Sequence, residues 1–501
     1  MKFREQLEDA ITEEAKKLSL RYHAYHNALH LEHERRKKRT TAVQAKVLKV
    51  PDYWLIDRKF DPFYVHRNRS SIARSIAEKI TRLDYSPRGP HKRLIKKPKG
   101  GTREICVYQI PDAAVSSLFY RTLLKKNQHR FSGSSYAYRA DRNAHFAIQD
   151  IEVRIREYSR IFVAEYDFSK FFDSIDHDHL FSQFNANGFS ISPRDEHVIK
   201  AFLKPGTRGI PQGTSLSLFL ANLVCWKLDR RLEDRGLKFA RYADDTLIWS
   251  PEFSKISDAA HILHDFSAET GVKINYKVVE GVYTKSKGIR LLCSDEMPSE
   301  FAGRTNSVDF LGYQISIDNI SIKHDSVVKI KRQINFILYD HLLRPLRGSK
   351  LSAIQIPSNG RDPDLVSALS SIRRYLYGNL SDEFIRRFLA GSTGHIFYKG
   401  VMSFYPLLTD KQQMCDLDGW LVNQVWKAVR MRLRLLVKWK FNRAGDFPFN
   451  VPRAKFVADL RTYKKHGRGR YSIPSFVVIY LALRKIVSEQ GVQQLLGKDG
   501  Y

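Results

Sequence analysis

With 501 residues, of which 43% are hydrophobic and 12% aromatic, the chain exceeds what one hydrophobic core can hold and predicts roughly two to four folded domains. Its formal net charge of +31 requires a polyanion or an anionic surface as partner, and no apolar run approaches the length that crosses a bilayer, so we expect nucleic acid and no membrane. The four cysteines lie far apart without a C-x-x-C pair, which argues against a disulfide framework or a zinc finger and favours a location in the reducing cytoplasm.

The N-terminal region, residues 1–60, is expected to be a helical segment. It begins as a charged amphipathic helix that lacks the apolar core of a signal peptide. A basic run at residues 34–39 fits a solvated helix face and a nucleic-acid contact equally well. After several prolines, the pattern predicts a helix over residues 70–83 and two short strands around a Pro/Gly turn over residues 93–107.

The middle and the end of the chain differ in their hydrophobic patterns. Residues 110–320 alternate helical and strand-like periods, which is typical of an α+β domain, whereas amphipathic helices such as 417–440 dominate afterwards. We therefore expect an α+β domain over residues 61–325 and an all-α domain over residues 326–501. Residues 321–501 hold 31 Lys and Arg against 13 Asp and Glu, so +18 of the net charge lies there.

Two adjacent aspartates, Asp244 and Asp245, stand at the predicted tip of a β-hairpin over residues 241–250. The apolar run that follows them places the second strand in a core. Two like charges beside a buried strand are unfavourable unless a cation lies between them, so a divalent metal is the simplest explanation. Taken alone, however, an Asp-Asp pair is more often an ordinary turn.

A third aspartate, Asp167, ends an apolar strand that begins near Ile161. Alone, it fits a helix N-cap as well as a metal ligand. Phosphoryl transfer assisted by two metal ions needs at least two carboxylates on rigid elements, bridging cations about 3.5–4 Å apart. A strand end and a hairpin tip would supply them, so the three aspartates together favour a metal site.

Four motifs in order carry a resemblance to a known family. They are D-F-S-K-F-F-D at residues 167–173, G-I-P-Q-G-T-S at 209–215, Y-A-D-D at 242–245 and F-L-G-Y at 310–313. Together they resemble the palm of a reverse transcriptase, in the bacterial branch that includes group II intron and retron enzymes. The resemblance implies a right-hand polymerase fold with palm and fingers over residues 61–325, and dNTPs as substrates.

The resemblance also implies roles for individual residues. Asp167, Asp244 and Asp245 would be catalytic and would hold two Mg²⁺ ions, or Mn²⁺ in their place, together with the Phe168 carbonyl. Phe172 would be the steric gate that excludes a 2′-hydroxyl, with a core aromatic as the alternative reading. The other nucleotide-binding residues would be Lys97 and Arg103 in a fingers hairpin, Arg139 in a second fingers motif, and Gln212. The primer grip would be Phe310, Leu311, Gly312 and Tyr313.

The surroundings of these motifs resemble a narrower branch. Intron-type enzymes usually carry prolines after the P-Q-G loop, whereas residues 214–222 have none. Together with the stretches 371–381 and 401–408, this resembles the AbiK-like reverse transcriptases of phage defence by abortive infection. That branch implies a HEAT-like helical C-terminal domain, homo-oligomers and DNA synthesis without a template, primed by a protein tyrosine that stays attached to the single-stranded product. The sequence does not select the priming residue among its 24 tyrosines.

A basic stripe in the C-terminal region is the expected DNA-binding surface. Lys427, Arg430, Arg434 and Lys438 share one face of a predicted helix, and residues 464–470 add a second basic patch. A solvated surface is the alternative for both. Three functions stay open at this point: untemplated DNA synthesis, a conventional RNA-templated reverse transcriptase, and a non-enzymatic nucleic-acid-binding protein.

Overall fold

The computed structural model describes most of the chain, and the described residues fall into two compact units. The units comprise Met1–His30 with Lys46–Asn306, and Leu31–Ala45 with Ser307–Tyr501. Among the described residues, no helix combines the length and the apolar composition that crossing a bilayer requires. The described residues are 2–37, 47–96, 101–184, 186–203, 205–276, 288–294, 303–351, 356–357, 362–378, 380–392, 398–461 and 472–492.

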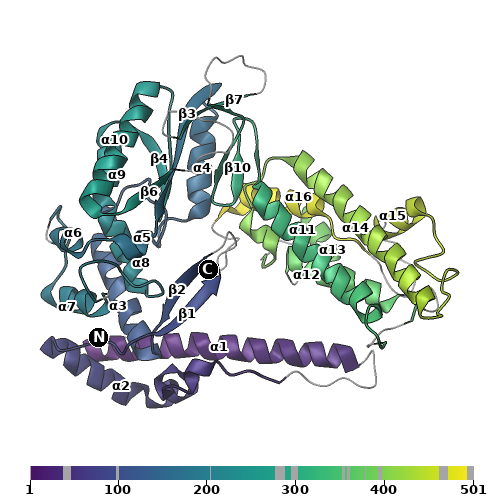
Figure 1. The fold of residues 1–501 in the computed structure, drawn as a ribbon, viewed down its shortest axis with the longest axis horizontal. Coiled ribbons are helices and arrows are strands. Elements are labelled where there is room, and N and C mark those ends of the chain that lie inside the picture. Colours follow the sequence, from purple (N-terminus) through teal and green to yellow (C-terminus); the bar gives the residue numbers. More distant parts are fainter. Residues whose placement is uncertain are drawn as a thin grey trace. The chain divides into compact units, whose positions relative to one another are not determined.

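The first unit is built on a mixed sheet with the strand order β4–β5–β3–β7–β8, in which β6 also pairs with β3 (Figure 1). All paired strands are antiparallel except β7 and β8. The central strand β3 is apolar and mostly buried, as a strand covered on both faces must be. The strands are β3 (Arg160–Ser169), β4 (Lys238–Tyr242), β5 (Asp245–Ser250), β6 (Lys273–Tyr276), β7 (Ile289–Cys293) and β8 (Arg304–Thr305).

Helices cover this sheet and extend its core. The long helix α10 packs against β3, β5 and β6 and lies beside α9, whereas α4 packs against β4. One continuous hydrophobic core joins the sheet to α3 and α8. The helices are α3 (Ile110–Asn127), α4 (Ala144–Ile155), α5 (Phe171–Ser174), α6 (His177–Ser182), α7 (Pro193–Phe202), α8 (Ser215–Val224), α9 (Trp226–Asp234) and α10 (Phe253–Thr270), with a 3₁₀ turn at Gln128–Arg130.

The N-terminal part of the first unit consists of two helices and a hairpin. Helix α1 (Phe3–Lys37) buries one side of its first turns in the core, and short 3₁₀ turns at Asp52–Trp54 and Arg58–Phe60 lead to α2 (Pro62–Arg82). Helix α2 begins well before the predicted residue 70, because Asp61 caps it by accepting a hydrogen bond from the Phe63 amide (2.8 Å). The predicted hairpin is present as β1 (His91–Lys96) and β2 (Thr102–Val107), paired antiparallel.

The second unit begins with a three-stranded antiparallel sheet, β9 (Val308–Phe310), β10 (Tyr313–Ile315) and β11 (Ile320–Ile322). From residue 324 onward the described residues form only helices and loops, which confirms the predicted all-α character of the C-terminal region. Helix α14 packs against α11 and α16, and α16 also packs against α13. The helices are α11 (His324–Leu338), which continues as a π-turn (Tyr339–Leu343) and a 3₁₀ turn (Arg344–Leu346), α12 (Pro363–Tyr377), α13 (Asp382–Leu389), a 3₁₀ turn (Val401–Phe404), α14 (Lys411–Lys438), α15 (Arg453–Arg461) and α16 (Phe476–Gln490).

A buried arginine holds the helices of the second unit together. The Arg432 side chain on α14 is fully buried and forms ion pairs with Asp362 (3.0 Å) and Asp364 (2.8 Å) at the start of α12. Its Nη1 also donates to the Leu342 carbonyl (3.1 Å). A buried charge is tolerated only with such partners, so this contact fixes the position of α12 against α14.

Candidate active site

The strand register brings two of the predicted carboxylates face to face. Strands β3 and β5 are antiparallel, and the last of their paired positions is Tyr166 opposite Thr246. One step further along each strand lie Asp167 on β3 and Asp245 on β5. Because antiparallel partners advance in opposite directions, this register sets Asp167 opposite Asp245. The two carboxylates therefore come from neighbouring strands of the most buried part of the sheet.

The third carboxylate, Asp244, belongs to the tight connection between β4 and β5. Tyr242 pairs with Asp245, so only Ala243 and Asp244 form the loop of the predicted hairpin. Ala243 is buried and has a φ of 60°, a left-handed conformation that a residue with a side chain rarely adopts. Asp244 is thus presented from a short, rigid turn.

The electrostatics of Asp244 agree with this convergence. Burial and, to a smaller extent, the negative charges of Asp167 and Asp245 together raise the pKa of the Asp244 carboxyl to about 6, whereas Arg103 on β2 opposes the shift. All three carboxylates are half-buried. The structure therefore gathers Asp167, Asp244 and Asp245 into one acidic cluster and brings the predicted nucleotide-binding residue Arg103 near it.

The cluster suits a hard divalent cation in its donor atoms. Carboxylate oxygens are the ligands that Mg²⁺ prefers, and mutually repelling half-buried carboxylates gain most from a cation between them. In the part of the chain that the structure describes, however, no three His, Cys, Asp or Glu side chains are already arranged as a metal site. The donor set therefore fits a divalent ion, and ligation requires the three side chains to turn toward it.

The G-I-P-Q-G loop is joined directly to the β1–β2 hairpin. The Cys106 amide on β2 donates to the Gln212 carbonyl (2.8 Å). Gly213 has a φ of 116°, and a Cβ added there would lie within 3.0 Å of the Cys106 carbonyl oxygen, so only glycine permits this approach. The half-buried Gln212 side chain is thereby held beside the strand that carries Arg103.

The two adjacent phenylalanines after Asp167 have different surroundings. Phe171 is buried and stacks on Phe168 at 5.6 Å between ring centroids. Phe172 is only half-buried and meets Phe171 edge-on, and its carbonyl accepts a hydrogen bond from the Ile210 amide (2.7 Å). Phe171 is therefore the core aromatic, and Phe172 is the ring with a partly exposed face beside the G-I-P-Q-G loop.

The other predicted site residues are engaged in different contacts, belong to the second unit or fall outside the described residues. The Arg139 guanidinium is bound to the Asp141 carboxylate (2.8 Å) and donates to the Ser132 carbonyl (2.6 Å), so its contacts are structural. Lys97 lies outside the described residues, as do residues 464–470. The DNA-binding candidates Lys427, Arg430, Arg434 and Lys438 are all exposed on α14.

The predicted primer-grip residues belong to the second unit. Phe310 and Tyr313 are paired across the hairpin of β9 and β10, while Leu311 and Gly312 make its turn with φ values of 48° and 85°. The Tyr313 hydroxyl donates to the Phe404 carbonyl (3.1 Å). The hairpin thus has the two-residue form expected for F-L-G-Y and is anchored within its own unit.

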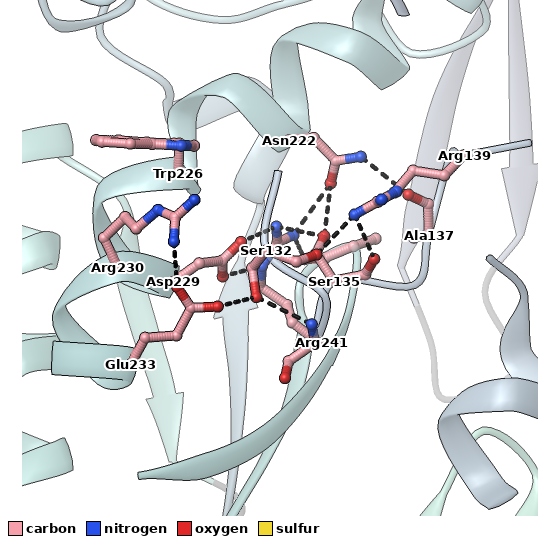
Figure 2. Close-up of polar contacts among 12 residues, drawn as sticks. Ser132, Ser135, Ala137, Arg139, Asn222, Trp226, Asp229, Arg230, Glu233 and Arg241 are labelled. Carbon is pink, nitrogen blue, oxygen red and sulfur yellow. Dashed lines mark hydrogen bonds and ion pairs between the residues drawn. The ribbon is translucent and has the colours of Figure 1, made fainter. Parts of the chain in front are cut away.

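Sequence reasoning missed Arg241, which lies on β4 three residues before Asp244 (Figure 2). Its side chain is fully buried, and each of its five N–H donors has an acceptor. A charged residue inside a strand that enters the core was the available signal, because such a residue needs a buried partner. The contacts are Nε and Nη2 to the two Asp229 carboxylate oxygens (both 2.7 Å), Nη2 to Ser135 Oγ (2.8 Å), and Nη1 to Asn222 Oδ1 (3.2 Å) and the Ala243 carbonyl (3.0 Å).

Tyr138 is a second residue that the sequence did not single out as part of the site. Burial raises the pKa of its phenol to about 12, and Asp244 and Tyr242 contribute to the increase. Its φ of 60° is another left-handed conformation in a residue with a side chain. The Tyr138 hydroxyl is therefore close enough to feel the charges of both Asp244 and Arg103.

Known proteins resemble the part of the chain that contains these residues. Residues 95–315 match the family model of the reverse transcriptase (RNA-dependent DNA polymerase). The chain is similar to the Retron Ec86 reverse transcriptase of Escherichia coli, with 30% identity over 144 residues, 27% of this chain and 43% of that protein. It is also similar to Protein YkfC of Escherichia coli (strain K12), with 23% identity over 164 residues, 30% of this chain and 43% of that protein.

The matched parts leave much of each protein uncovered. The chain spans 43% of the length of each of these two curated relatives. Among solved structures, it is similar to a telomerase from Candida tropicalis in complex with a fragment of telomeric RNA, with 14% identity and a TM-score of 0.38 over 86% of this chain and 64% of that one.

The acidic cluster, the G-I-P-Q-G loop and strand β2, which the loop contacts, all lie within the matched range. Over residues 95–315 this chain is therefore similar to a reverse transcriptase domain.

Proposed function

We propose that the chain is a DNA polymerase that joins dNTPs at the cluster of Asp167, Asp244 and Asp245. The observation that carries the proposal is the convergence of these carboxylates, seen in the strand register and in the raised pKa of Asp244. With the Phe168 carbonyl, they would hold two Mg²⁺ ions, or Mn²⁺. Such a pair supplies Lewis-acid chemistry, by which the attacking hydroxyl is activated and the charge of the leaving pyrophosphate is offset.

The neighbouring residues would bind and orient the nucleotide. Arg103, whose charge opposes the negative field at Asp244, would bind the triphosphate, because guanidinium groups match phosphate oxygens. The exposed part of the Phe172 ring would exclude a 2′-hydroxyl, and Gln212 would lie near the incoming nucleotide. Lys97 would add a second charge to the triphosphate site. Arg139 would act indirectly, through its contacts with Ser132 and Asp141.

We further propose that synthesis is untemplated and primed by a tyrosine of the protein. Support comes from residues 214–222, which lack the prolines of templated intron-type enzymes, and from the helical C-terminal region. In this proposal, the N-terminal helical segment comprises residues 1–60, and the fingers and palm comprise residues 61–325. The HEAT-like domain comprises residues 326–501. The proposal includes a homo-oligomer that acts in the cytoplasm in abortive infection.

A templated reverse transcriptase is the second candidate. The similarity to the Retron Ec86 reverse transcriptase favours it, since that relative shares 30% identity over 144 residues. Both candidates use the same carboxylates and differ in primer and template. A purely nucleic-acid-binding role is less well supported, because it gives no reason for three carboxylates to converge in so basic a chain.

The deciding experiment supplies the purified chain with labelled dNTPs and Mg²⁺, without template or primer. We expect label that migrates with the protein after denaturation and is released by protease or nuclease. Product that forms only when an RNA template and a primer are added would establish the templated candidate instead. The variant Asp244→Asn serves as the control, and incorporation that survives this change would contradict the assigned site.

The proposed role in defence is tested separately in cells. Expression of the chain should lower the plating efficiency of phages, whereas the Asp244→Asn variant, expressed at the same level, should not. Equal protection by the variant would separate defence from polymerisation and overturn this part of the proposal.

A further inference from the structure

Arg241 connects the buried framework of the first unit to the turn that carries Asp244. On one side, its guanidinium donates two hydrogen bonds of 2.7 Å to the Asp229 carboxylate of α9, and both side chains are almost completely buried. On the other side, its Nη1 donates to the Ala243 carbonyl at 3.0 Å. The turn is thus tied through one side chain to a helix of the core. Figure 2 shows Arg241 beside Asp229.

The bond to the Ala243 carbonyl acts on a backbone that needs support. A φ of 60° is unfavourable for alanine because its Cβ approaches the neighbouring carbonyl, and glycine is the residue usually found in such turns. Strained conformations persist only where the surroundings enforce them. Here the support is a hydrogen bond, which Nη1 of Arg241 donates to the carbonyl of Ala243, the strained residue itself.

The backbone of Arg241 is fixed as firmly as its side chain. Its amide donates to the Ser134 carbonyl (2.9 Å), and its carbonyl accepts from the Tyr136 amide (2.9 Å). Ser135, between them, accepts from Nη2. The guanidinium therefore has no alternative position from which it could release the turn without breaking several buried hydrogen bonds.

We propose that Arg241, clamped by Asp229, is a positioning residue that holds the Ala243–Asp244 turn so that Asp244 faces Asp167 and Asp245 and together they bind a divalent cation. The inference rests on the proposed function of these carboxylates. Arg241 and Asp229 neutralise each other, so their contribution is geometric and adds little net charge at the site. Neighbours that orient metal ligands typically change metal affinity by about 10–100-fold when they are altered.

The chain provides a matched control for this proposal in its second buried arginine. Arg432 is also fully buried and also paired with aspartates, but its acceptors are Asp362, Asp364 and the Leu342 carbonyl, none of which belongs to the turn. A change of either arginine to lysine removes the planar fork while retaining the charge. Loss of general stability is common to both variants, and only Arg241→Lys should change cation binding.

The experiment measures Mn²⁺ binding to the full-length chain without nucleotides, by the electron paramagnetic resonance signal of the free ion. We expect Arg241→Lys to raise the dissociation constant for Mn²⁺ about tenfold or more, and Arg432→Lys to change it less than about threefold. Circular dichroism at the same temperature confirms that each variant is folded. If Arg241→Lys is unfolded, Ser135→Ala replaces it, because this change removes only one acceptor of the guanidinium, and it should still weaken Mn²⁺ binding more than Arg432→Lys does.

A double-mutant cycle then tests the role of the strained turn. Glycine adopts the left-handed conformation without strain, so the effect of Arg241→Lys on Mn²⁺ binding should shrink to about threefold or less in an Ala243→Gly background. An undiminished effect would contradict the proposed support of the turn.

The possible failures of the two proposals can be told apart. If the native chain binds Mn²⁺ and Asp244→Asn removes the binding, but Arg241→Lys leaves the dissociation constant unchanged, this inference is wrong and the proposed function stands. If the native chain shows no binding that depends on Asp244, both are wrong.

Discussion

The carbonyl oxygen of Cys106 occupies the space into which a side chain at Gly213 would project, so that strand β2 and the G-I-P-Q-G loop are in backbone contact. The hydrogen bond from the Cys106 amide to the Gln212 carbonyl accompanies this contact. In the proposed function, a nucleotide bound between Arg103 and Gln212 would therefore contact one surface that strand β2 and the loop form together.

The first prediction concerns this contact. Gly213→Ala adds a Cβ against the Cys106 backbone and also strains a φ of 116°, so it should lower the free energy of unfolding by about 2–4 kcal/mol and raise the KM for dNTPs. The control is Gly236→Ala, where φ is also positive but no atom lies within 4 Å, with an expected loss of about 1 kcal/mol. Chemical denaturation measures both, and equal losses would show that the close contact is unimportant.

The second prediction follows from the pKa of Asp244. Because this pKa is raised from 3.8 to about 6, the folded chain binds the proton more tightly than the unfolded chain, so stability falls as the pH rises between these two values and stays lowered above about pH 6. Asp244→Asn should then increase the free energy of unfolding by about 2 kcal/mol at pH 8, and by less than about 1 kcal/mol near pH 4.5.

Urea unfolding in the presence of a chelator measures this difference. Asp265→Asn is the control, since Asp265 is exposed on α10 and no effect at either pH is expected. A destabilised Asp244→Asn variant at pH 8 would mean that the carboxylate has favourable partners that outweigh its neighbours' repulsion.

The third prediction separates the adjacent phenylalanines. Phe172→Ala should raise the incorporation of ribonucleotides relative to deoxynucleotides by at least about tenfold, because a 2′-hydroxyl would no longer be excluded. Phe171→Ala should instead lower the free energy of unfolding by about 3–5 kcal/mol through the cavity left beside Phe168. Competition between labelled rNTPs and dNTPs measures the first effect, and unchanged sugar selectivity would refute the steric gate.

The fourth prediction concerns the basic stripe on α14. Replacing Lys427, Arg430, Arg434 and Lys438 by glutamine should weaken binding of single-stranded DNA and reduce the salt dependence of its affinity by about 0.7 for each phosphate that is no longer neutralised. Equal changes at Arg67, Arg74, Lys79 and Arg82, which are exposed on α2, form the control. If the substitutions on α14 and those on α2 reduce the affinity for single-stranded DNA and its salt dependence equally, the stripe on α14 is not a specific DNA interface.

The sequence predicted the acidic cluster because its signals are local. A strand that ends in Asp167, a short hairpin that carries Asp244, and glycines at the G-I-P-Q-G loop are each readable from a few residues. The α+β fold and the helical C-terminal region followed from hydrophobic periodicity in the same way. Residue roles taken from the family resemblance, such as those of Gln212 and the primer-grip residues, stay predictions.

What the sequence could not predict depends on which partners a charged side chain finds in the folded chain. Arg139 looks like a free basic group in a motif, yet its guanidinium is bound to Asp141 and to a carbonyl seven residues away. Arg241 looks like a surface residue before a turn, yet it is buried because Asp229 and Asn222 approach it from two helices. The start of α2 was missed for a simpler reason, since the prediction gave Asp61 no weight as a cap.

The five acceptors around Arg241 also bear on the order in which the first unit folds. They come from the loop at Ser135, from α8, from α9 and from the turn itself, so the guanidinium is satisfied only when all of these segments are in place. Until then a buried, partly unpaired charge opposes closure of the turn. Chains in which one of these segments is missing or unfolded would therefore contain the three aspartates but lack the arrangement proposed to bind a cation.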